Sequence, residues 1–324
     1  GKITHCLFDK TGTLTTDQMV PVGVISKKSC KISDSNFVKA VKTEMTLCSE
    51  AEPLISMILA SCHSLVAVEG SGVVGDPIEI AGVKGVGWKY DAVKEVCSPG
   101  DWEAEQKAAD NAKKELETLK DNQGARIPIE ERLKVLENKI QLSQQKAKDS
   151  PVRQTRIIRR HHFASKLQRM SVVAQINGKS DFVAGSHACL VKGSAEALLP
   201  LMKPESLPPW YEGMHMTMAE QGMRVLALAY KWIDGSTEAL RQLPRQDVET
   251  DLRFAGFIAF ACKTRGDSGT VIKSLMSSDH ACSMLTGDAP LTALHVARQV
   301  GMCEKDAFAL QLSLKGSRGS GVLW

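Results

Sequence analysis

One heptapeptide constrains this chain more than any other feature, and it directly follows a short apolar run near the amino terminus. Residues 3–8 are Ile-Thr-His-Cys-Leu-Phe, and residues 9–15 are Asp-Lys-Thr-Gly-Thr-Leu-Thr. A short apolar run bounded by a turn is typical of a buried strand in a parallel sheet. Asp9 would then lie at the carboxyl end of that strand, where open α/β sheets bind their ligands. The sequence therefore predicts a functional carboxylate at this position.

The residue types of the heptapeptide suit phosphoryl transfer. A carboxylate at a strand end can attack a phosphoryl group and carry it as an aspartyl phosphate. Lys10 can neutralise phosphate charge, the hydroxyl of Thr11 can donate to phosphate oxygens, and Gly12 lets the backbone approach closely. Because seven residue types stand in a fixed order, an ordinary Asp in a strand-to-loop turn is the weaker interpretation.

Composition and charge exclude several classes of protein. The 324 residues are enough for two domains, 43% of them are hydrophobic, and the formal net charge is only +4, so we expect no nucleic-acid partner. The nine cysteines are scattered without metal-ligand spacing, which predicts reduced thiols. Because the chain contains no run of 18 apolar residues and no leader at Gly1, we expect it not to cross a membrane.

The middle of the chain changes composition. From Pro99 to Ser150 charged, Ala and Gln residues dominate, with narrow apolar stripes interrupted at 122–124 and at Pro128. This pattern predicts an antiparallel helical hairpin over 99–150. Residues 101–148 are either an insertion with a solvated face, the commoner case, or a docking arm for a protein partner. The basic run between 153 and 162 is either solvated or lies near an anion, such as a phosphate or a lipid head group.

The stretch after the basic run predicts a nucleotide-binding turn. Phe163 opens a turn that carries Lys166, Gln168 and Arg169 before an apolar strand. An aromatic face beside cationic side chains can stack a base next to its phosphates. The competing interpretation is that Phe163 packs in the core.

Other positions of this half suit the same pocket. Lys192 and Gly193 lie between an apolar stretch and a helix start, so the lysine would point into a pocket unless it lies on the surface. Arg224 stands in an apolar strand, where a cation without a partner is costly and a phosphate is a reasonable partner. His63, at the end of an apolar helix, is more often a core residue than a ligand. Residues 75–81, Gly-Asp-Pro-Ile-Glu-Ile-Ala, predict a helix capped by Asp76.

The last part of the chain returns to an α/β pattern. Residues 252–262, 267–277, 281–285 and 290–300 predict a strand, a helix, a strand and a helix. This is the crossover pattern of a parallel sheet, and we expect both strands to join the strand that carries Asp9. Thr286, Gly287 and Asp288 follow the second strand, where they can bind the transferred phosphoryl group.

Five segments resemble motifs of the P-type ATPases, in the order of that family: 9–15, 75–81, 163–173, 192–193 and 286–288. These are membrane pumps whose cytoplasmic head has a haloacid-dehalogenase-like fold. The resemblance implies an α/β fold with an incomplete doubly wound parallel sheet, formed by residues 1–24 and 250–312. An inserted α+β nucleotide-binding domain, 25–249, would interrupt this sheet, and 313–324 would be a flexible Gly/Ser-rich tail.

The resemblance also implies roles for individual residues. Asp9 would be the phosphorylated nucleophile, and Asp9 and Thr11 would hold Mg²⁺. ATP would bind with its adenine on Phe163 near Glu79 and Lys192. Lys166 or Arg169 would supply the charge of a lysine that the family has where this chain has Gln168, and Arg224 would contact a phosphate. The family's threonine-glycine-aspartate motif matches Thr286, Gly287 and Asp288, although Ala289 replaces the usual Asn.

Two further stretches resemble the fifth class of P-type ATPases, in its endoplasmic-reticulum branch. Cys262 and a following lysine stand where most pumps have Asp-Pro, and residues 290–293 are Pro-Leu-Thr-Ala. The resemblance implies movement of a cation or a transmembrane helix at the endoplasmic-reticulum membrane, with the catalytic part on the cytosolic face.

We expect the membrane and actuator segments of such an ATPase, and its Gly-Asp-Gly-x-Asn-Asp segment, to be missing from these 324 residues. Two alternatives remain open. One is a catalytically impaired fragment that binds nucleotide or docks a partner. The other is a soluble phosphatase of the same fold, which Thr11 disfavours because such phosphatases usually have a second Asp there.

Overall fold

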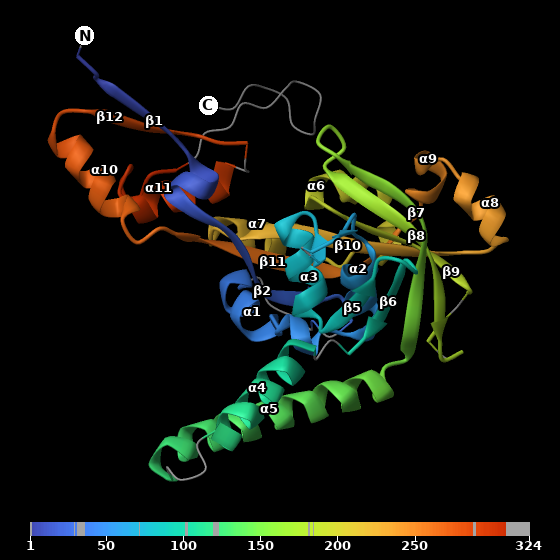
Figure 1. Cartoon of the computed structure of the whole chain (residues 1–324). Helices are drawn as coiled ribbons and strands as arrows, with labels where there is room; N and C mark the ends of the chain where they lie inside the picture. Colours follow the sequence, from blue (N-terminus) through green and yellow to red (C-terminus); the bar gives the residue numbers. More distant parts are fainter. Residues whose placement is uncertain are drawn as a thin grey trace. The chain divides into compact units, whose positions relative to one another are not determined.

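The computed structural model describes residues 2–28, 30, 36–70, 72–100, 103–118, 123–180, 182–183, 185–287 and 290–308 (Figure 1). The fold is mixed α/β and divides into two compact units. The first unit comprises Gly1–Met45, Pro208–Leu226 and Phe257–Trp324, and the second comprises Thr46–Leu207 and Ala227–Gly256. The predicted tail, 313–324, lies outside the described residues.

A parallel pair of strands organises the first unit. β1 (His5–Asp9) pairs with β12 (Ala281–Leu285), which confirms the predicted parallel pairing of the strand that carries Asp9. Among the described residues this sheet has two strands. Side chains of one face, Phe8 and Met284 among them, pack against buried residues, whereas those of the other face are exposed. The prediction of a buried strand at 3–8 is therefore wrong.

Two helices cover one face of this strand pair. α10 (Ser268–Ser277) and α11 (Pro290–Val300) occupy the predicted helical ranges. Their residues Ile272, Val296 and Val300 form a buried cluster with Leu14, and Phe8 and Met284 of the strands pack against it. This small core holds the turn that follows Asp9.

The other strands of the first unit do not join the pair. β2 (Thr15–Ser26) lies next to β11 (Arg253–Thr264), which begins in the second unit. Each of these strands lies next to one of its own length: β2 and β11 have 12 residues each, and β1 and β12 have five each. The prediction that 252–262 joins the sheet of Asp9 is therefore wrong. α1 (Phe37–Glu44) packs on α7 (Tyr211–Glu220).

An antiparallel sheet forms the centre of the second unit, in the order β10-β9-β8-β7-β6-β5. Its strands are β5 (Trp88–Asp91), β6 (Val96–Pro99), β7 (Val152–Ala164), β8 (Arg169–Gly178), β9 (His187–Gly193) and β10 (Arg224–Ile233), the last of which begins in the first unit. All seven residues of β9 are buried. The middle of this sheet is therefore a well-covered core, unlike the strand pair of the first unit.

Short elements surround this sheet. They are the hairpin of β3 (Val66–Val68) and β4 (Gly72–Val74), and the helices α2 (Pro53–Ser61), α3 (Pro77–Gly85), α6 (Ala195–Leu198), α8 (Thr237–Gln242) and α9 (Arg245–Val248). The predicted cap of α3 is confirmed, because Asp76 Oδ1 accepts a hydrogen bond from the backbone N–H of Ile78 at 2.8 Å.

The predicted helical hairpin is present. α4 (Glu103–Thr118) packs along α5 (Gln123–Asp149), and Figure 1 shows the two helices side by side. Lys113 of α4 and Glu137 of α5 form an ion pair at 3.1 Å. Pro128 lies inside α5, so the predicted break there is wrong. Since a proline near a helix start removes few hydrogen bonds, α5 accommodates it.

None of the described helices is both long and apolar enough to span a bilayer.

Candidate functional site

The carboxylate of Asp9 is exposed at the carboxyl end of β1. Its Oδ1 accepts a hydrogen bond from the backbone N–H of Lys10 at 2.9 Å. The turn Lys10–Leu14 then folds back, with Gly12 at φ +81°, a conformation that strains any residue with a Cβ. Thr11 and Thr13 are exposed on this turn, whereas the side chain of Lys10 is buried.

The register of β1 and β12 brings two predicted segments to the same edge. Asp9 lies opposite Leu285, and Thr286 and Gly287 directly follow. An added Cβ at Gly287 would meet nothing within 4 Å, so the space around this residue is open. Asp288 and Ala289 lie outside the described residues. An exposed carboxylate beside an open turn is accessible to a ligand.

In the second unit Lys192 and Glu79 form a buried ion pair. Lys192 Nζ lies 3.2 Å from Glu79 Oε1, and both side chains are less than 10% exposed. Glu79 Oε2 also accepts a hydrogen bond from the backbone N–H of Ser64 at 2.8 Å. The surface position considered for Lys192 is therefore wrong, because β9 is buried along its whole length. Each charge offsets the cost of burying the other.

Gly193 connects this ion pair to the turn after Phe163. Gly193 pairs with Arg169 of β8. The next residue, Ser194, caps α6 and donates a hydrogen bond to Gln168 Oε1 at 3.1 Å. An ideal Cβ at Gly193 would lie 2.5 Å from Leu198 Cδ1, 2.6 Å from Arg169 Cβ and 2.7 Å from the carbonyl oxygen of Gln168. Glycine is required here because β9, α6 and the turn meet too closely for a side chain.

The turn at 165–168 presents an aromatic ring and a cation. Phe163, near the end of β7, is 57% exposed, so core packing is excluded for this ring. Lys166 is also exposed. Arg169, by contrast, donates from Nε to Glu249 Oε2 at 2.7 Å. Of the two cations considered for this turn, Lys166 is therefore the exposed one.

His63 lies beside the ion pair as a core residue. Burial, together with the positive charges of Lys192 and Arg160, lowers the pKa of His63 to about 3. The ring lies 3.5 Å from Cys97 Sγ and edge-on to Tyr90, with 4.4 Å between the ring centroids. The imidazole is therefore neutral, and the core interpretation is confirmed.

The basic run between 153 and 162 forms part of β7 and is partly solvated. Arg153 and Arg156 are exposed. Arg160 instead turns inward, where it forms an ion pair with Glu95 and donates to the backbone carbonyl of His63 at 2.9 Å.

Arg224 is exposed at the first position of β10. The argument that a buried cation needs a phosphate there is therefore wrong. The strand begins at this residue, so its side chain reaches solvent.

The sequence did not reveal Glu249. Residues 245–251 are mostly polar, as in a linker, but they contain α9 and a glutamate that is only 1% exposed. Its spacing from Arg245, at i and i+4 next to the apolar Val248, is the signal that could have found it.

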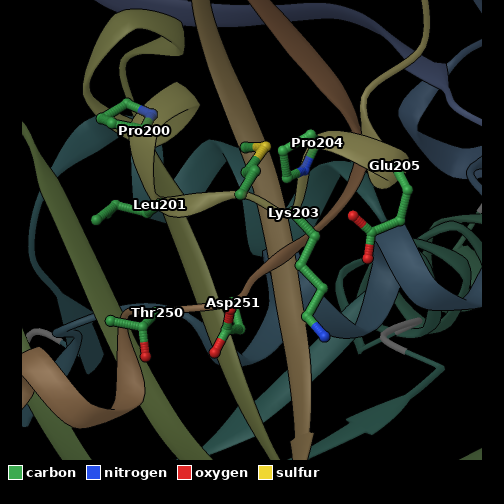
Figure 2. Close-up of a pocket in the computed structure, with 8 residues that line it drawn as sticks. Pro200, Leu201, Lys203, Pro204, Glu205, Thr250 and Asp251 are labelled. Carbon is green, nitrogen blue, oxygen red and sulfur yellow. The ribbon is translucent and has the colours of Figure 1, made fainter.

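Two pockets of the second unit are lined by none of the residues predicted to bind the nucleotide. One of about 370 Å³ is shown in Figure 2; it is lined by Pro200, Leu201, Met202, Lys203, Pro204, Glu205, Thr250 and Asp251. The other, of about 210 Å³, includes Ser64, Arg160 and His162 among its lining residues. This second pocket borders the Lys192–Glu79 pair through Ser64. The backbone N–H of Ser64 donates to Glu79, and the hydroxyl of Ser64 contacts the ring of His162.

Among the described residues no group of three or more His, Cys, Asp or Glu side chains could hold a metal ion. A Mg²⁺ ion that keeps several waters and a substrate phosphate needs only one or two protein oxygens. The exposed carboxylate of Asp9 and the oxygens of Thr11 are donors of the type that such a Mg²⁺ ion uses.

Comparison with known proteins gives matches along the whole chain. No family model matches it. It is 34% identical to the "Probable manganese-transporting ATPase PDR2" of Arabidopsis thaliana over 99% of this chain and 21% of that protein. It is 30% identical to the "Endoplasmic reticulum transmembrane helix translocase" of Saccharomyces cerevisiae, over 93% of this chain and 19% of that protein. It is 28% identical to the human "Polyamine-transporting ATPase 13A3", over 100% of this chain and 24% of that protein.

The chain thus spans about a fifth of the length of these curated relatives. These relatives are P5-type ATPases, the class whose motifs the sequence resembles. From end to end, this chain is homologous to one segment of the P5-type ATPases.

Proposed function

We propose that this chain is the nucleotide-binding and phosphorylation part of a P5-type ATPase of the endoplasmic-reticulum membrane. The whole protein would use ATP to move a cation or a transmembrane helix, as the names of the relatives suggest for those proteins. The haloacid-dehalogenase-like phosphorylation domain would consist of residues 1–24 and 250–312, and the nucleotide-binding domain of residues 25–249. Membrane and actuator segments of the full-length protein would be its partners, with the 101–148 hairpin as a candidate docking arm.

The chemical step would take place on Asp9. One carboxylate oxygen attacks the γ-phosphorus of ATP, the bond from that phosphorus to the β,γ-bridging oxygen breaks, and ADP leaves with the electron pair. Thr286, Gly287 and Asp288 would bind the transferred phosphoryl group. Mg²⁺ bound through Asp9 and Thr11 would neutralise phosphate charge during the transfer. The exposed position of Asp9 supports this role because a nucleophile must reach its substrate.

The nucleotide would bind on the second unit. Adenine would stack on the exposed ring of Phe163, and the Glu79–Lys192 pair would form the base of its pocket. Lys166 would supply the cation that Gln168 does not. Arg224, an exposed residue of the first unit, would contact a phosphate.

One observation carries the proposal for phosphoryl transfer. The parallel register of β1 and β12 sets Asp9 opposite the residue that precedes Thr286 and Gly287. These residues are more than 270 positions apart in the sequence. Their meeting at one strand edge is what an aspartyl-phosphate site requires, because nucleophile and phosphate ligands must act on the same group.

Phosphoenzyme formation from labelled ATP tests this function. We expect the chain, with Mg²⁺, to incorporate acid-stable, hydroxylamine-sensitive label, and Asp9→Asn to abolish it. Asp279→Asn, which changes an exposed acid of the same unit, is the matched control and should label normally. Nucleotide binding without label would favour the impaired fragment instead. Steady hydrolysis of a small phosphomonoester would favour the phosphatase.

A further inference from the structure

A second buried carboxylate lies beside the nucleotide-binding turn, and neither the family motifs nor the proposed chemistry uses it. Glu249 directly follows α9 and is 1% exposed. Its Oε2 accepts a hydrogen bond from Arg169 Nε at 2.7 Å, and its Oε1 lies 3.1 Å from Arg245 Nε. One acid therefore contacts two arginines.

Each arginine reaches a different strand beside the turn. Arg169 is the first residue of β8, where it pairs with Ala164 on one side and with Gly193 on the other. Arg245 donates from Nη2 to the carbonyl oxygens of His161 at 2.7 Å and of His162 at 2.5 Å. These are the two residues before Phe163. Glu249 is thus connected to both strands that the turn 165–168 joins.

This contact lies on the opposite face of the sheet from the ion pair of Lys192. Lys192 is opposite Met170 in the register, whereas Arg169 precedes Met170 on β8. Because successive side chains of a strand point to opposite faces, Arg169 and Lys192 point away from each other. The Lys192–Glu79 pair therefore lies on one face of the sheet, and Glu249 with its two arginines lies on the other.

The group around Glu249 is poorly suited to stabilise the fold. Four of its buried polar atoms have no hydrogen-bond partner: His161 Nε2, Ser171 Oγ, Arg245 Nε and Glu249 Oε1. Arg245 Nε and Glu249 Oε1 face each other as charges, without the geometry of a hydrogen bond. Ser171 pairs with His161 in the register, so the four atoms belong to one cluster. Such buried ionic clusters often stabilise a fold less than apolar residues of equal volume would.

We propose that Glu249 is a positioning residue of the nucleotide site: through Arg169 and Arg245 it fixes the turn that presents Phe163 and Lys166. The proposal rests on the proposed function, because it assigns a role to residues of that same site. It also explains why Arg169 is not available to a phosphate. Glu249 itself touches no ligand.

Hydrogen exchange without nucleotide tests the positioning directly. In Glu249→Gln we expect the amides of residues 164–169 to exchange faster than in the unchanged protein, while those of α2 and α3 keep their rates. Asp247→Asn, an exposed acid on α9, is the matched control and should change nothing. If Glu249→Gln does not fold, Glu249→Asp keeps the charge and shortens its reach. Unchanged exchange at 164–169, or a uniform rise throughout the second unit, would overturn the proposal.

A double-mutant cycle on the affinity for an ATP analogue tests the path of action. Glu249→Gln and Arg169→Gln should each weaken binding about tenfold, which is within the contribution of one stacked base. The double variant should be no weaker than either single one, because both changes release the same turn. Additive losses would show that Glu249 does not act through Arg169. If the unchanged protein binds no analogue, the proposed function fails, and the exchange experiment still decides the role of Glu249.

Discussion

The acidic side chain at the end of the strand pair in the first unit is exposed, whereas two acidic side chains beside the sheet of the second unit are buried. Asp9 ends a strand whose side chains are exposed or half-buried, and its carboxylate faces solvent. Glu79 and Glu249 lie against strands with buried interiors, and each contacts a cation within about 3 Å. The difference in burial separates an acid that can react from acids that can only hold other groups in place.

Physical chemistry gives a reason for this division. An exposed carboxylate stays charged and accessible, as a nucleophile must, and leaving it exposed costs the fold nothing. A buried carboxylate needs a partner, and the pair then fixes the backbone segments that supply it. In this chain the proposed reacting group and the proposed positioning groups therefore lie in different structural settings.

The largest expected effect concerns the buried pair. Lys192→Met should lower the free energy of unfolding by roughly 3–5 kcal/mol, because it leaves Glu79 as a buried charge. Lys113→Met, which breaks the half-exposed pair with Glu137, should cost no more than about 1 kcal/mol. Chemical denaturation measures both values. Equal costs would contradict the contrast between buried and exposed charges. The double variant Lys192→Met, Glu79→Leu, which removes both charges, should recover part of the stability that Lys192→Met loses.

Acid should weaken the second unit through His63. Its pKa in the folded protein is about 3, below the ordinary value of 6.5, so between these pH values the unfolded chain binds a proton that the folded chain does not. Stability from this group is complete above pH 6.5 and is lost as the pH falls. The loss between pH 7 and pH 4 should be roughly 3 kcal/mol. His63→Asn should flatten the measured pH dependence, and an unchanged slope would show that His63 is not the cause.

Substitution of two glycines should distinguish the crowded region around Gly193 from the open region around Gly287 by their effects on stability. Gly193→Ala should destabilise the protein by about 1–3 kcal/mol, because its methyl group would overlap three neighbours. Gly287→Ala, which meets nothing within 4 Å, should change stability by less than about 0.5 kcal/mol. Thermal unfolding compares the two. Similar shifts in melting temperature would mean that the turn after β9 is looser than described.

The smallest effect on stability, with a clear effect on binding, should come from the exposed ring of the second unit. Phe163→Ala should weaken ATP binding about tenfold or more, because base stacking contributes about 1–3 kcal/mol. Stability should hardly change, since the ring is 57% exposed. Phe308→Ala removes a 78% exposed ring of the first unit and should affect neither property. A loss of stability without a loss of affinity for ATP would show that Phe163 has a structural role and does not bind the base.

Local signals predicted much of the fold. The strand at 281–285 and the helix at 290–300 have the predicted bounds, because turn residues and a proline mark their ends. The capped start of α3 was predicted for the same reason. The sheet to which each strand belongs was harder to predict. Nothing in the apolar run of β11 indicates that it lies next to β2 instead of β1, since strand partners depend on contacts far apart in the sequence.

The candidate site was predictable to the same extent. Asp9, Phe163 and Lys192 stand at strand ends, where residue order alone indicates a site. The exposure of Arg224 was missed, because a strand start and a strand interior look alike in an apolar stretch. The contact of Glu249 with Arg169 was also missed. Those residues are 80 positions apart, and only the folded chain shows that they meet.

Chemical mapping of the phosphorylated residue tests the central claim most directly. Borohydride reduces an aspartyl phosphate to homoserine, so treatment of the chain after incubation with ATP and Mg²⁺ should convert Asp9, as read by mass spectrometry of its peptide. The account predicts homoserine at position 9, with Glu79 and Glu249 unmodified. Reduction at another acid, or an intact Asp9 in a chain that carries acid-stable label from ATP, would contradict it.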